Sequence, residues 1–373
     1  MTGSSPRTRV GFAVFRLAPA GGLEQHALRL AGILVGRGCP VTVITTRPPA
    51  TAPPGVTIET IEPRGRTNHG RLAAFAADAA AGVAGRFDRT VAFHAIPGFD
   101  AIFCADPSRA APAGWRRWAP RYRTYAALER RALASADLVL MLSTAQLEAF
   151  ARHHPAARPR LRLLPPTVDR KRAAAGVMAE AKTQARAALG LAPRERVWLW
   201  LGLQAHTKGL DRALAALAAV PDARLLVCGL DPAGRGGAAM GRLAERLGVS
   251  PRVRWLGFVD DAALGRAMAA ADLLVHPSRA DVTGTVILES MANGLPVVTT
   301  AVCGYGEHVT AAGAGVVLPE PFAAEALAAA LAGATPVRLA DWSQRALAYA
   351  GRDELYAGLE RAADLILAAG RDP

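Results

Sequence analysis

The sequence is poor in the features that mark membrane-spanning and secreted proteins. It contains no run of about twenty apolar residues, the length that a membrane-spanning helix needs. Its start, MTGSSPRTRVGFAVF, carries arginines but only a short apolar run and no small-residue cleavage site. Such a start differs from a signal peptide, and we therefore expect a cytoplasmic protein.

Cysteine is scarce as well. The four cysteines, Cys39, Cys104, Cys228 and Cys303, lie far apart and form no CxxC pair. Buried thiols in a reducing compartment fit this spacing better than a disulfide framework or a metal site. A complete GxGxxG is also missing, so the sequence gives no support for a nicotinamide cofactor.

What is present fits two globular domains. The chain has 373 residues, more than one ordinary hydrophobic core supports. Of these residues 51% are apolar and 20% charged, as in globular proteins. The charge is uneven, because residues 1–170 hold 23 arginines and 11 acids, whereas the remainder has 21 basic and 20 acidic residues. We therefore expect the first half to face an anionic partner.

Apolar runs alternate with glycine loops and amphipathic segments. Residues 10–15, 23–35 and 41–45 read as strand, helix and strand, the βαβ signature of a doubly wound α/β domain. The same order restarts at residues 197–202. Further strands are predicted at residues 56–61, 90–93, 138–142, 162–164, 224–228, 253–256, 273–276 and 296–299, and further helices at 209–217, 242–247, 262–271 and 286–292.

These patterns predict two doubly wound, Rossmann-like domains facing a central cleft, where such folds bind ligands. The proline-containing break LLPPTVDRKRAAAG places the border between domains 1–168 and 169–352. The remaining residues, 353–373, carry a helical pattern that could cross back to the first domain.

Two strand-to-helix loops could approach a phosphate. Gly21 and Gly22 follow the first strand, and their missing Cβ atoms allow backbone amides near a helix start to meet an anion. Lys208 enters the helix at 209–217 and could bring its ammonium group to a diphosphate. A tight turn and a solvated lysine are the plainer alternatives.

A third loop holds two carboxylates eight residues apart, Asp281 and Glu289, in the stretch SRADVTGTVILESMANGLPVVTT. Asp281 could meet sugar hydroxyls, and Glu289 could accept bonds from the two hydroxyls of a ribose. The backbone of Val282, Thr283, Gly284 and Thr285 could supply amides to a phosphate between them. Alternatively, Asp281 is an N-cap and Glu289 a surface residue of the helix.

D-x7-E followed by SMANGLPVVTT resembles the E-x7-E signature of the family 4 glycosyltransferases, and GGLEQHALRLAGILVGRGCPVTVIT resembles the N-terminal loop of that family. Several stretches are similar more narrowly to its lipopolysaccharide core glucosyltransferases, from about residue 10 to 365. They are TNHGR, IPGFDAIFCAD, RYRTYAALER, LLPPTVD, AADLLVHP and AVCGYG.

The resemblance implies a GT-B fold and a retaining, metal-independent transfer of a hexose, most simply glucose, from a UDP-sugar to the heptose of the lipopolysaccharide inner core. No DxD motif is present, which agrees with a reaction without metal, and no cofactor is expected. Lys208 would stabilise the leaving diphosphate. Residues 282–285 would bind phosphate and hexose, Glu289 the ribose, and Gly21 and Gly22 would let the N-terminal loop close.

Three positions depart from the family. Asp281 is one methylene shorter than the usual glutamate, and Thr207 replaces a basic residue unless Arg279 or an arginine of the first domain substitutes for it. His26 stands where relatives carry an acid. We predict Asp281, Lys208 and His26 as the catalytic residues, with His26 as an acceptor-side base, although a structural histidine is the alternative.

Four further residues are predicted on the acceptor side: His94 and Asp100, in the loop after a predicted strand, and Asn68 and His69 of TNHGR. Asn, Gly and Pro also make turns regardless of function, which is the alternative.

The segment RAAPAGWRRWAPRYRTYAALERR, residues 109–131, holds seven arginines and one acid with aromatic residues between them. An anionic leaflet attracts such a segment by about 1 kcal/mol per basic residue near its surface. We predict membrane contact through Trp115, Arg116, Arg117, Trp118, Arg121 and Arg123. A solvated face is the alternative, and the absence of a nucleic-acid motif argues against that partner.

The sequence therefore predicts a UDP-sugar-dependent hexosyltransferase, peripheral on the cytoplasmic face of the inner membrane, with lipopolysaccharide as acceptor. Another glycolipid or another nucleotide-sugar is the alternative within the family. A sugar-binding or nucleic-acid-binding protein without catalysis is the alternative outside it.

Overall fold

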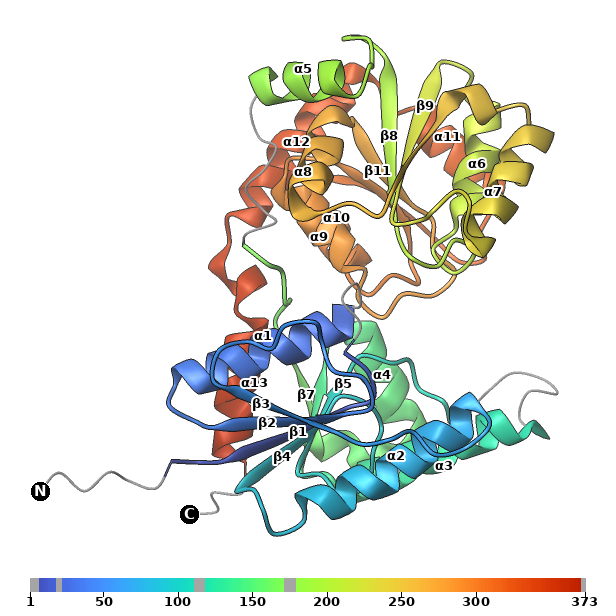
Figure 1. Cartoon of the computed structure of the whole chain (residues 1–373). Helices are drawn as coiled ribbons and strands as arrows, with labels where there is room; N and C mark the ends of the chain where they lie inside the picture. The colour runs from blue at the N-terminus through green and yellow to red at the C-terminus, as the bar shows by residue number, and fades with distance from the viewer. Residues whose placement is uncertain (1–6, 18–21, 111–117, 171–178, 370–373) are drawn as a thin grey trace, which may run out of the picture. The chain divides into compact units, whose positions relative to one another are not determined.

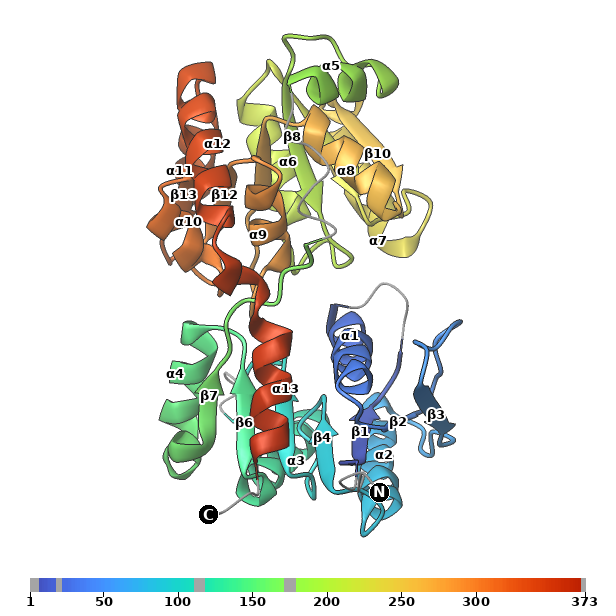
Figure 2. The ribbon, with the colours of Figure 1, turned by 90° about the vertical axis from the view of Figure 1, so that its left-hand side faces the viewer.

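The computed structural model describes residues 7–17, 22–110, 118–170 and 179–369 (Figure 1). The chain divides into two compact units, unit 1 (Met1–Thr167 with Ala357–Pro373) and unit 2 (Val168–Tyr356). Sequence analysis places the corresponding borders after residues 168 and 352. Each unit is a parallel sheet with helices on both faces, so the predicted doubly wound α/β class is confirmed (Figures 1 and 2).

Unit 1 contains a seven-stranded sheet in the order β3-β2-β1-β4-β5-β6-β7, and all its neighbouring strands are parallel. The central strand β1 reads VGFAV and is buried throughout, as expected of a parallel strand covered on both faces. The strands are β1 (Val10–Val14), β2 (Val41–Thr45), β3 (Val56–Thr60), β4 (Arg89–Ala92), β5 (Ala101–Cys104), β6 (Leu138–Met141) and β7 (Leu161–Leu163).

The helices of unit 1 cover the two faces of this sheet in pairs. Helices α1 (Gly22–Gly36) and α13 (Gly358–Ala368) pack together on one face, and α2 (Asn68–Val83) packs with α3 (Pro120–Ser135) on the other (Figure 1). Arg37 at the end of α1 donates to Asp364 of α13 at 2.7 Å, which fastens the last helix of the chain to the first. Helix α4 (Thr144–His153) and the 3-10 helix η2 (Pro155–Arg160) lead into β7.

Unit 2 contains a six-stranded parallel sheet in the order β10-β9-β8-β11-β12-β13. Alternate residues of β8 feed two cores: Val197 and Leu199 pack with α5, α8, α9 and α12, whereas Trp198 and Trp200 pack with α6, α7 and α11. Its strands are β8 (Arg196–Leu201), β9 (Ala223–Cys228), β10 (Val253–Gly257), β11 (Leu273–His276), β12 (Val297–Thr300) and β13 (Gly315–Leu318). Its helices are α5 (Ala179–Ala188), α6 (Leu210–Ala219), α7 (Arg235–Arg246), η3 (Ser250–Arg252), α8 (Asp261–Ala270), α9 (Thr285–Ala292), α10 (Gly306–Ala312), α11 (Ala324–Ala332), α12 (Pro336–Ala350) and η4 (Asp353–Tyr356).

The helical pattern predicted at the end of the chain is interrupted. It consists of η4 and α13, and Gly358 opens α13. The Gly358 amide donates to Pro166 O at 3.0 Å, and a Cβ atom at this position would lie 2.3 Å from Pro165 O. The backbone at position 358 therefore lies too close to Pro165 for any residue with a Cβ atom, and this glycine stands between η4 and the rest of α13. Among the described residues, no helix is long and apolar enough to cross a bilayer.

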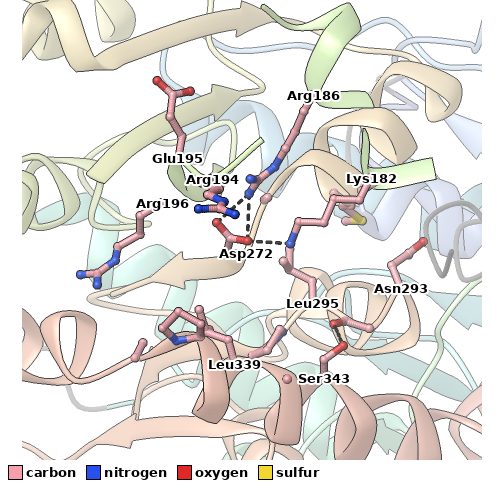
Figure 3. Close-up of a pocket in the computed structure, with 18 of the residues that line it drawn as sticks. Lys182, Arg186, Arg194, Glu195, Arg196, Asp272, Asn293, Leu295, Leu339 and Ser343 are labelled. Carbon is pink, nitrogen blue, oxygen red and sulfur yellow. Dashed lines mark hydrogen bonds and ion pairs between the residues drawn. The ribbon is translucent and has the colours of Figure 1, made fainter. Parts of the chain in front are cut away.

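A buried charge cluster fastens α5 to the amino edge of the sheet in unit 2. Asp272, just before β11, accepts hydrogen bonds from Lys182 Nζ at 2.6 Å, from Arg186 Nη2 at 2.8 Å and from the Val197 amide at 2.8 Å (Figure 3). The Arg186 side chain is only 5% exposed. Because both ends of the pair are shielded from water, each ion depends on the other for compensation.

We expect Asp272→Ala to lower the free energy of unfolding by about 3–5 kcal/mol, because it leaves the buried Arg186 guanidinium without its anion. Urea unfolding measures this loss. Asp341→Ala is the matched control, since Asp341 pairs with Arg345 at the surface and should cost no more than about 1 kcal/mol. Equal losses for the two variants would contradict the structural role of the Asp272 cluster.

Candidate functional site

Three loops of unit 2 meet at the carboxyl edge of its sheet. They follow β8, β11 and β12 and lead into α6, α9 and α10. Two of them are joined directly, because Asp281 forms an isolated parallel bridge with Cys303 and its carbonyl accepts from the Gly304 amide at 3.2 Å. The carboxyl ends of parallel strands are where doubly wound folds bind ligands.

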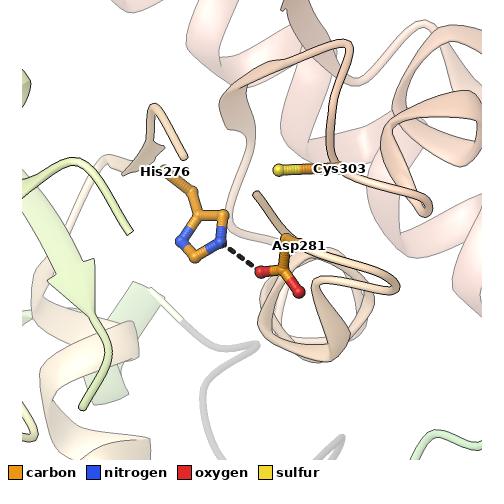
Figure 4. A group of neighbouring side chains, drawn as sticks. All are labelled: His276, Asp281 and Cys303. Carbon is orange, nitrogen blue, oxygen red and sulfur yellow. Dashed lines mark hydrogen bonds and ion pairs between the residues drawn. The ribbon is translucent and has the colours of Figure 1, made fainter. Parts of the chain in front are cut away.

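Asp281 lies at the centre of these loops (Figure 4). Its Oδ2 atom is 2.6 Å from Lys208 Nζ and 2.9 Å from His276 Nε2, while its Oδ1 atom accepts from the Gly284 amide at 2.9 Å. The carboxylate is 10% exposed. The structure thus brings together the predicted catalytic residues Asp281 and Lys208.

The electrostatics of this cluster favour its charged forms. Burial alone would raise the pKa of Asp281, but the hydrogen bonds and charges of His276 and Lys208 outweigh it and lower the pKa to about 2. Burial alone would lower the pKa of His276, but Asp281 and Cys303 raise it to about 9. The site therefore holds a carboxylate between two cations at neutral pH.

Two glycines in the left-handed region shape the loops around Asp281. Gly209 has φ 71° and precedes α6, and a Cβ atom there would lie 2.0 Å from Pro277 O in the β11–α9 loop. Gly284 has φ 75° and precedes α9. No side chain caps α9, so the N–H groups of its first turn and its dipole favour an anion. Asp281 accepts from the Gly284 amide, but Gly284 itself is the N-cap, so Asp281 is not the N-cap of the alternative interpretation.

The other predicted donor-binding residues surround this turn. Val282, Thr283 and Thr285 are half-buried, and Thr283 O accepts from the Tyr305 amide at 2.6 Å. Glu289 lies in the second turn of α9 and is 6% exposed, so it is not the surface residue of the alternative interpretation. The loop and the helix thus present a carboxylate, a helix N-terminus and a second carboxylate in sequence order.

Arg279 lies beside the position where the family carries a second basic residue. Its amide donates to Thr207 O at 2.8 Å, and its Nη1 atom donates to His206 O at 2.7 Å. The same guanidinium binds both oxygens of Asp211, at 2.8 and 2.7 Å. Arg279 therefore places a cation next to Thr207, but Asp211 already balances its charge.

In unit 1 the structure argues against His26 as a base. His26 lies in the second turn of α1, is 7% exposed, and packs on Phe103 with ring centroids 5.9 Å apart. Its Nε2 atom is 2.9 Å from Thr167 Oγ1. Burial, followed by the charge of Arg29, lowers its pKa to about 4. A buried, neutral ring of this kind packs the interior, because a base must reach its substrate. Gly22 begins α1, while Gly21 lies outside the described residues.

The structure also argues against the predicted acceptor-side role of Asp100. It precedes β5 at the amino edge of the sheet, where its Oδ2 atom accepts from the amide and hydroxyl of Thr90 at 2.8 and 2.9 Å. Its carbonyl accepts from the Asp137 and Leu138 amides at 2.9 and 3.1 Å. Asp100 therefore fastens β4, β5 and β6 together, and the acceptor-side assignment was wrong because the loop returns to the opposite edge.

The remaining acceptor-side predictions lie nearer the carboxyl edge or on a helix start. His94 follows β4, and its Nδ1 atom is 3.5 Å from Oδ2 of Asp106, which follows β5. Asn68 and His69 form the first turn of α2, which Thr67 caps by accepting from the Gly70 amide at 3.1 Å. TNHGR thus has the local capping chemistry of its alternative interpretation, whereas His94 faces a carboxylate.

The predicted membrane segment is only partly described. Trp115, Arg116 and Arg117 lie outside the described residues. Trp118 is 69% exposed just before α3, and Arg121 and Arg123 are exposed on that helix. The buried residues of α3, Leu128, Glu129, Ala132 and Leu133, lie toward its end, so the helix packs mainly through the part that follows Arg121 and Arg123.

Sequence analysis missed His276 and Cys303. His276 was assigned only to a strand, and Cys303 only to the buried thiols. They meet Asp281 because parallel pairing places the ends of β11 and β12 side by side. A histidine ending one predicted strand and a cysteine following the next were the available signal.

A separate cavity of about 760 Å³ opens in unit 2 (Figure 3). Its lining includes Arg196, which begins β8, Asp272, which precedes β11, and Pro296, which precedes β12. These residues mark the amino edge of the sheet. The cavity is therefore not part of the Asp281 site.

The chain matches two family descriptions, Glycosyltransferase Family 4 over residues 20–172 and Glycosyl transferases group 1 over residues 181–335. It is 33% identical over 373 residues to the lipopolysaccharide glucosyltransferase WaaG of Escherichia coli (strain K12), covering 96% of this chain and 98% of that protein. It is 37% identical over 179 residues to a D-inositol 3-phosphate glycosyltransferase of Mycobacterium sp. (strain JLS), covering 47% of this chain and 40% of that one.

Comparison with solved structures also finds WaaG. The crystal structure of WaaG, described as a glycosyltransferase involved in lipopolysaccharide biosynthesis, superposes with a TM-score of 0.87 at 32% identity, covering 96% of this chain and 99% of WaaG. A sucrose-phosphate synthase from Thermosynechococcus elongatus, 23% identical, has a TM-score of 0.80 over 96% of this chain and 98% of its own, and supports the fold alone. Two Rossmann-like units of this kind define a GT-B glycosyltransferase. The chain belongs to glycosyltransferase family 4.

We expect the burial of His26 to make stability depend on pH between about 6.5 and 4. The unfolded chain binds a proton at His26 more readily than the folded chain does, so stability falls as pH decreases through this range. In His26→Gln this part of the loss, up to about 3 kcal/mol, should disappear. Urea unfolding at pH 7 and pH 4.5 measures it.

His153→Gln is the control, because His153 is exposed on α4. This variant should keep the pH dependence of the wild type. Parallel pH profiles for the wild type and His26→Gln would contradict the buried, neutral state of His26.

Proposed function

We propose that this glycosyltransferase moves a hexose, specifically glucose, from a UDP-sugar to the heptose of the lipopolysaccharide inner core, with retention and without a metal ion. The similarity to WaaG over nearly the whole chain supports the acceptor class and the donor sugar. The observation that carries the proposal is the contact between Lys208 and Asp281 at the carboxyl edge of unit 2.

Lys208 is the residue that would neutralise the departing diphosphate. Its side chain is 24% exposed, and its Nζ atom lies 2.6 Å from a carboxylate oxygen. A donor that places its diphosphate here offers Lys208 a new anion and the first turn of α9 a second contact. Stabilising the leaving group in this way lowers the barrier, because charge develops on the diphosphate as the glycosidic bond breaks.

The two carboxylates would hold the two ends of the donor. Glu289 would accept bonds from the ribose hydroxyls, and Asp281 from the hexose hydroxyls. His276 and Gly284 stay bound to Asp281 when Lys208 turns to the diphosphate, so this shorter side chain keeps a fixed direction. A fixed carboxylate orients the hexose without reorganisation during the reaction.

In unit 1, His94 is the acceptor-side residue that the geometry favours. Its Nδ1 atom is paired with Asp106, whose pKa the His94 hydrogen bond and charge lower against the effect of burial. A histidine that is oriented by a carboxylate has the arrangement of a general base.

Another nucleotide-sugar or glycolipid is the competing proposal. Asp281 and Thr207 both lie where the hexose and the diphosphate would bind. The similarity to the D-inositol 3-phosphate glycosyltransferase of Mycobacterium sp. (strain JLS) extends over less than half of each protein, whereas the similarity to WaaG extends over nearly all of both, which favours the lipopolysaccharide acceptor.

Lys208→Ala should weaken binding of UDP-glucose by about 10- to 100-fold, the effect of losing one charge-assisted contact to the diphosphate. Calorimetric titration with EDTA present measures the Kd, and release of UDP with heptose-terminated lipopolysaccharide measures turnover. UDP-galactose, UDP-N-acetylglucosamine and GDP-mannose in the same titration identify the donor. Preference for one of these would keep the mechanism and replace glucose.

Lys182→Ala is the matched control. Lys182 also binds an aspartate at 2.6 Å in unit 2, but at the opposite edge of the sheet. It should leave the donor Kd unchanged. Equal weakening by both variants, or no binding of any nucleotide-sugar by the wild type, would sink the donor-site assignment.

We also propose that the protein is held on an anionic membrane surface through the basic segment around α3. The exposed Trp118, Arg121 and Arg123 support this proposal, because rings and guanidinium groups both find partners among headgroups. Such an electrostatic attachment fits an acceptor that is anchored in the lipid.

Replacing Arg116, Arg117, Arg121 and Arg123 by Gln should reduce sedimentation with vesicles that contain anionic lipid. The loss should be largest at low salt, because screening weakens the same attraction in the wild type. A control with the same change of charge replaces four exposed arginines of unit 2: Arg242, Arg246, Arg266 and Arg345. Equal binding by the wild type and both variants would rule out the proposed membrane surface.

A further inference from the structure

His276, Asp281 and Cys303 offer three different metal-binding atoms at one place. The imidazole nitrogen, the carboxylate oxygen and the thiol sulfur all lie within 4.8 Å of one another (Figure 4). His276 ends β11, Asp281 follows it by five residues, and Cys303 lies in the loop after β12. The whole cluster therefore belongs to unit 2.

We propose that these three side chains form a binding site for Zn²⁺ that excludes the sugar donor. Thiolate, imidazole and carboxylate are all ligands of zinc, and together they select it over Mg²⁺ or Ca²⁺, which prefer oxygen. Three protein ligands leave the fourth tetrahedral position open to water.

The distances are close to those that zinc requires. Zinc bonds of about 2.0–2.3 Å in a tetrahedron place neighbouring ligand atoms about 3.3–3.6 Å apart. His276 Nε2 and Asp281 Oδ2 are now 2.9 Å apart because they share a proton, and Cys303 Sγ is no farther than 4.8 Å from either ligand atom. Replacing the shared proton by a metal requires shifts of about 1 Å, which side-chain rotation supplies.

Neighbouring groups already orient the ligands. Gly284 N donates to the other oxygen of Asp281 at 2.9 Å. Ser278 Oγ lies 3.0 Å from His276 Nε2, the ligand atom itself, so zinc would replace this contact. Thr300 Oγ1 is 3.8 Å from Cys303 Sγ. Hydrogen bonds of this kind fix the direction of metal ligands in proteins.

The site shares one atom with the donor site. A zinc ion bound to Asp281 Oδ2 would displace Lys208 Nζ, now 2.6 Å away, and would occupy the position where Asp281 meets the hexose. Zinc would therefore inhibit by competition with the donor. Binding of the metal stands on the three side chains alone, whereas the competition rests on the proposed function.

Co²⁺ is the spectroscopic probe for this site. Titrated into the full chain after treatment with EDTA, it should give tetrahedral bands and an absorption from thiolate-to-cobalt charge transfer, both removed by Zn²⁺. Cys303→Ser should lose the charge-transfer band and weaken Zn²⁺ binding at least tenfold. Cys228→Ser is the matched control, because Cys228 is another buried thiol of unit 2, at the end of β9, and should keep both.

X-ray absorption of the zinc-loaded wild type tests the ligands even if Cys303→Ser does not fold, and one sulfur neighbour beside nitrogen or oxygen is expected. An octahedral cobalt spectrum, a zinc shell without sulfur, or Zn²⁺ binding of unchanged affinity in Cys303→Ser would overturn the site. In a separate titration, Zn²⁺ should raise the apparent Kd for UDP-glucose at least tenfold in the wild type but not in Cys303→Ser. Failure of UDP-glucose to bind in EDTA would refute the donor site, while the cobalt spectrum would still decide the metal site.

Discussion

One buried carboxylate organises the candidate site. Asp281 is shared between Lys208, His276 and the Gly284 amide, which come from the end of one strand, β11, and from the starts of two helices, α6 and α9. Removing one charge from such a cluster leaves the others buried without compensation. Because His276 and the Gly284 amide also bind the carboxylate, the direction of Asp281 does not depend on Lys208 alone. Under the proposed function, this is what allows Lys208 to turn to a diphosphate while Asp281 stays in place.

The two Lys–Asp pairs of unit 2 show that position in the sheet, more than residue type, decides what a pair does. Lys182–Asp272 and Lys208–Asp281 have the same 2.6 Å separation. Asp272 precedes a strand, and it also binds Arg186 and the Val197 amide, so its oxygens are used for packing α5. Asp281 follows a strand and precedes an uncapped helix, where an incoming anion finds N–H groups. The direction of the strands therefore separates the stabilising pair from the binding pair.

Much of this arrangement could be predicted from local patterns. Buried strands such as VTVIT and the strand–loop–helix order were sufficient for both sheets. D-x7-E and Lys208 drew attention to Asp281 and Lys208, which the structure places in contact. Short-range sequence patterns gave wrong predictions for residues whose position depends on contacts between distant parts of the chain. Asp100 lies in the same loop as His94, but eight residues after β4 this loop has already reached the amino edge of the sheet. His26 lies four and eight residues before Leu30 and Leu34, on the buried face of α1, where it packs on Phe103 as the structural alternative requires. The sequence shows no clear hydrophobic periodicity in the alanine-rich α11 or in the short β5 and β13. The two strands are defined by their pairing within the sheets.

The electrostatics of unit 2 explain why the departure at Thr207 matters. Arg279 lies beside it, but its two bonds to Asp211 form a balanced pair. Under the proposed function, the side chains nearest the diphosphate are Lys208 and His276, whose pKa Asp281 and Cys303 raise to about 9 against the effect of burial, and Asp281 offsets part of their charge. The N-terminus of α9 adds only about half a charge. Thr207 therefore leaves Lys208 as the basic side chain of this loop in the proposed diphosphate site. The arginine excess of residues 1–170, 23 against 11 acids, is a separate property of the sequence.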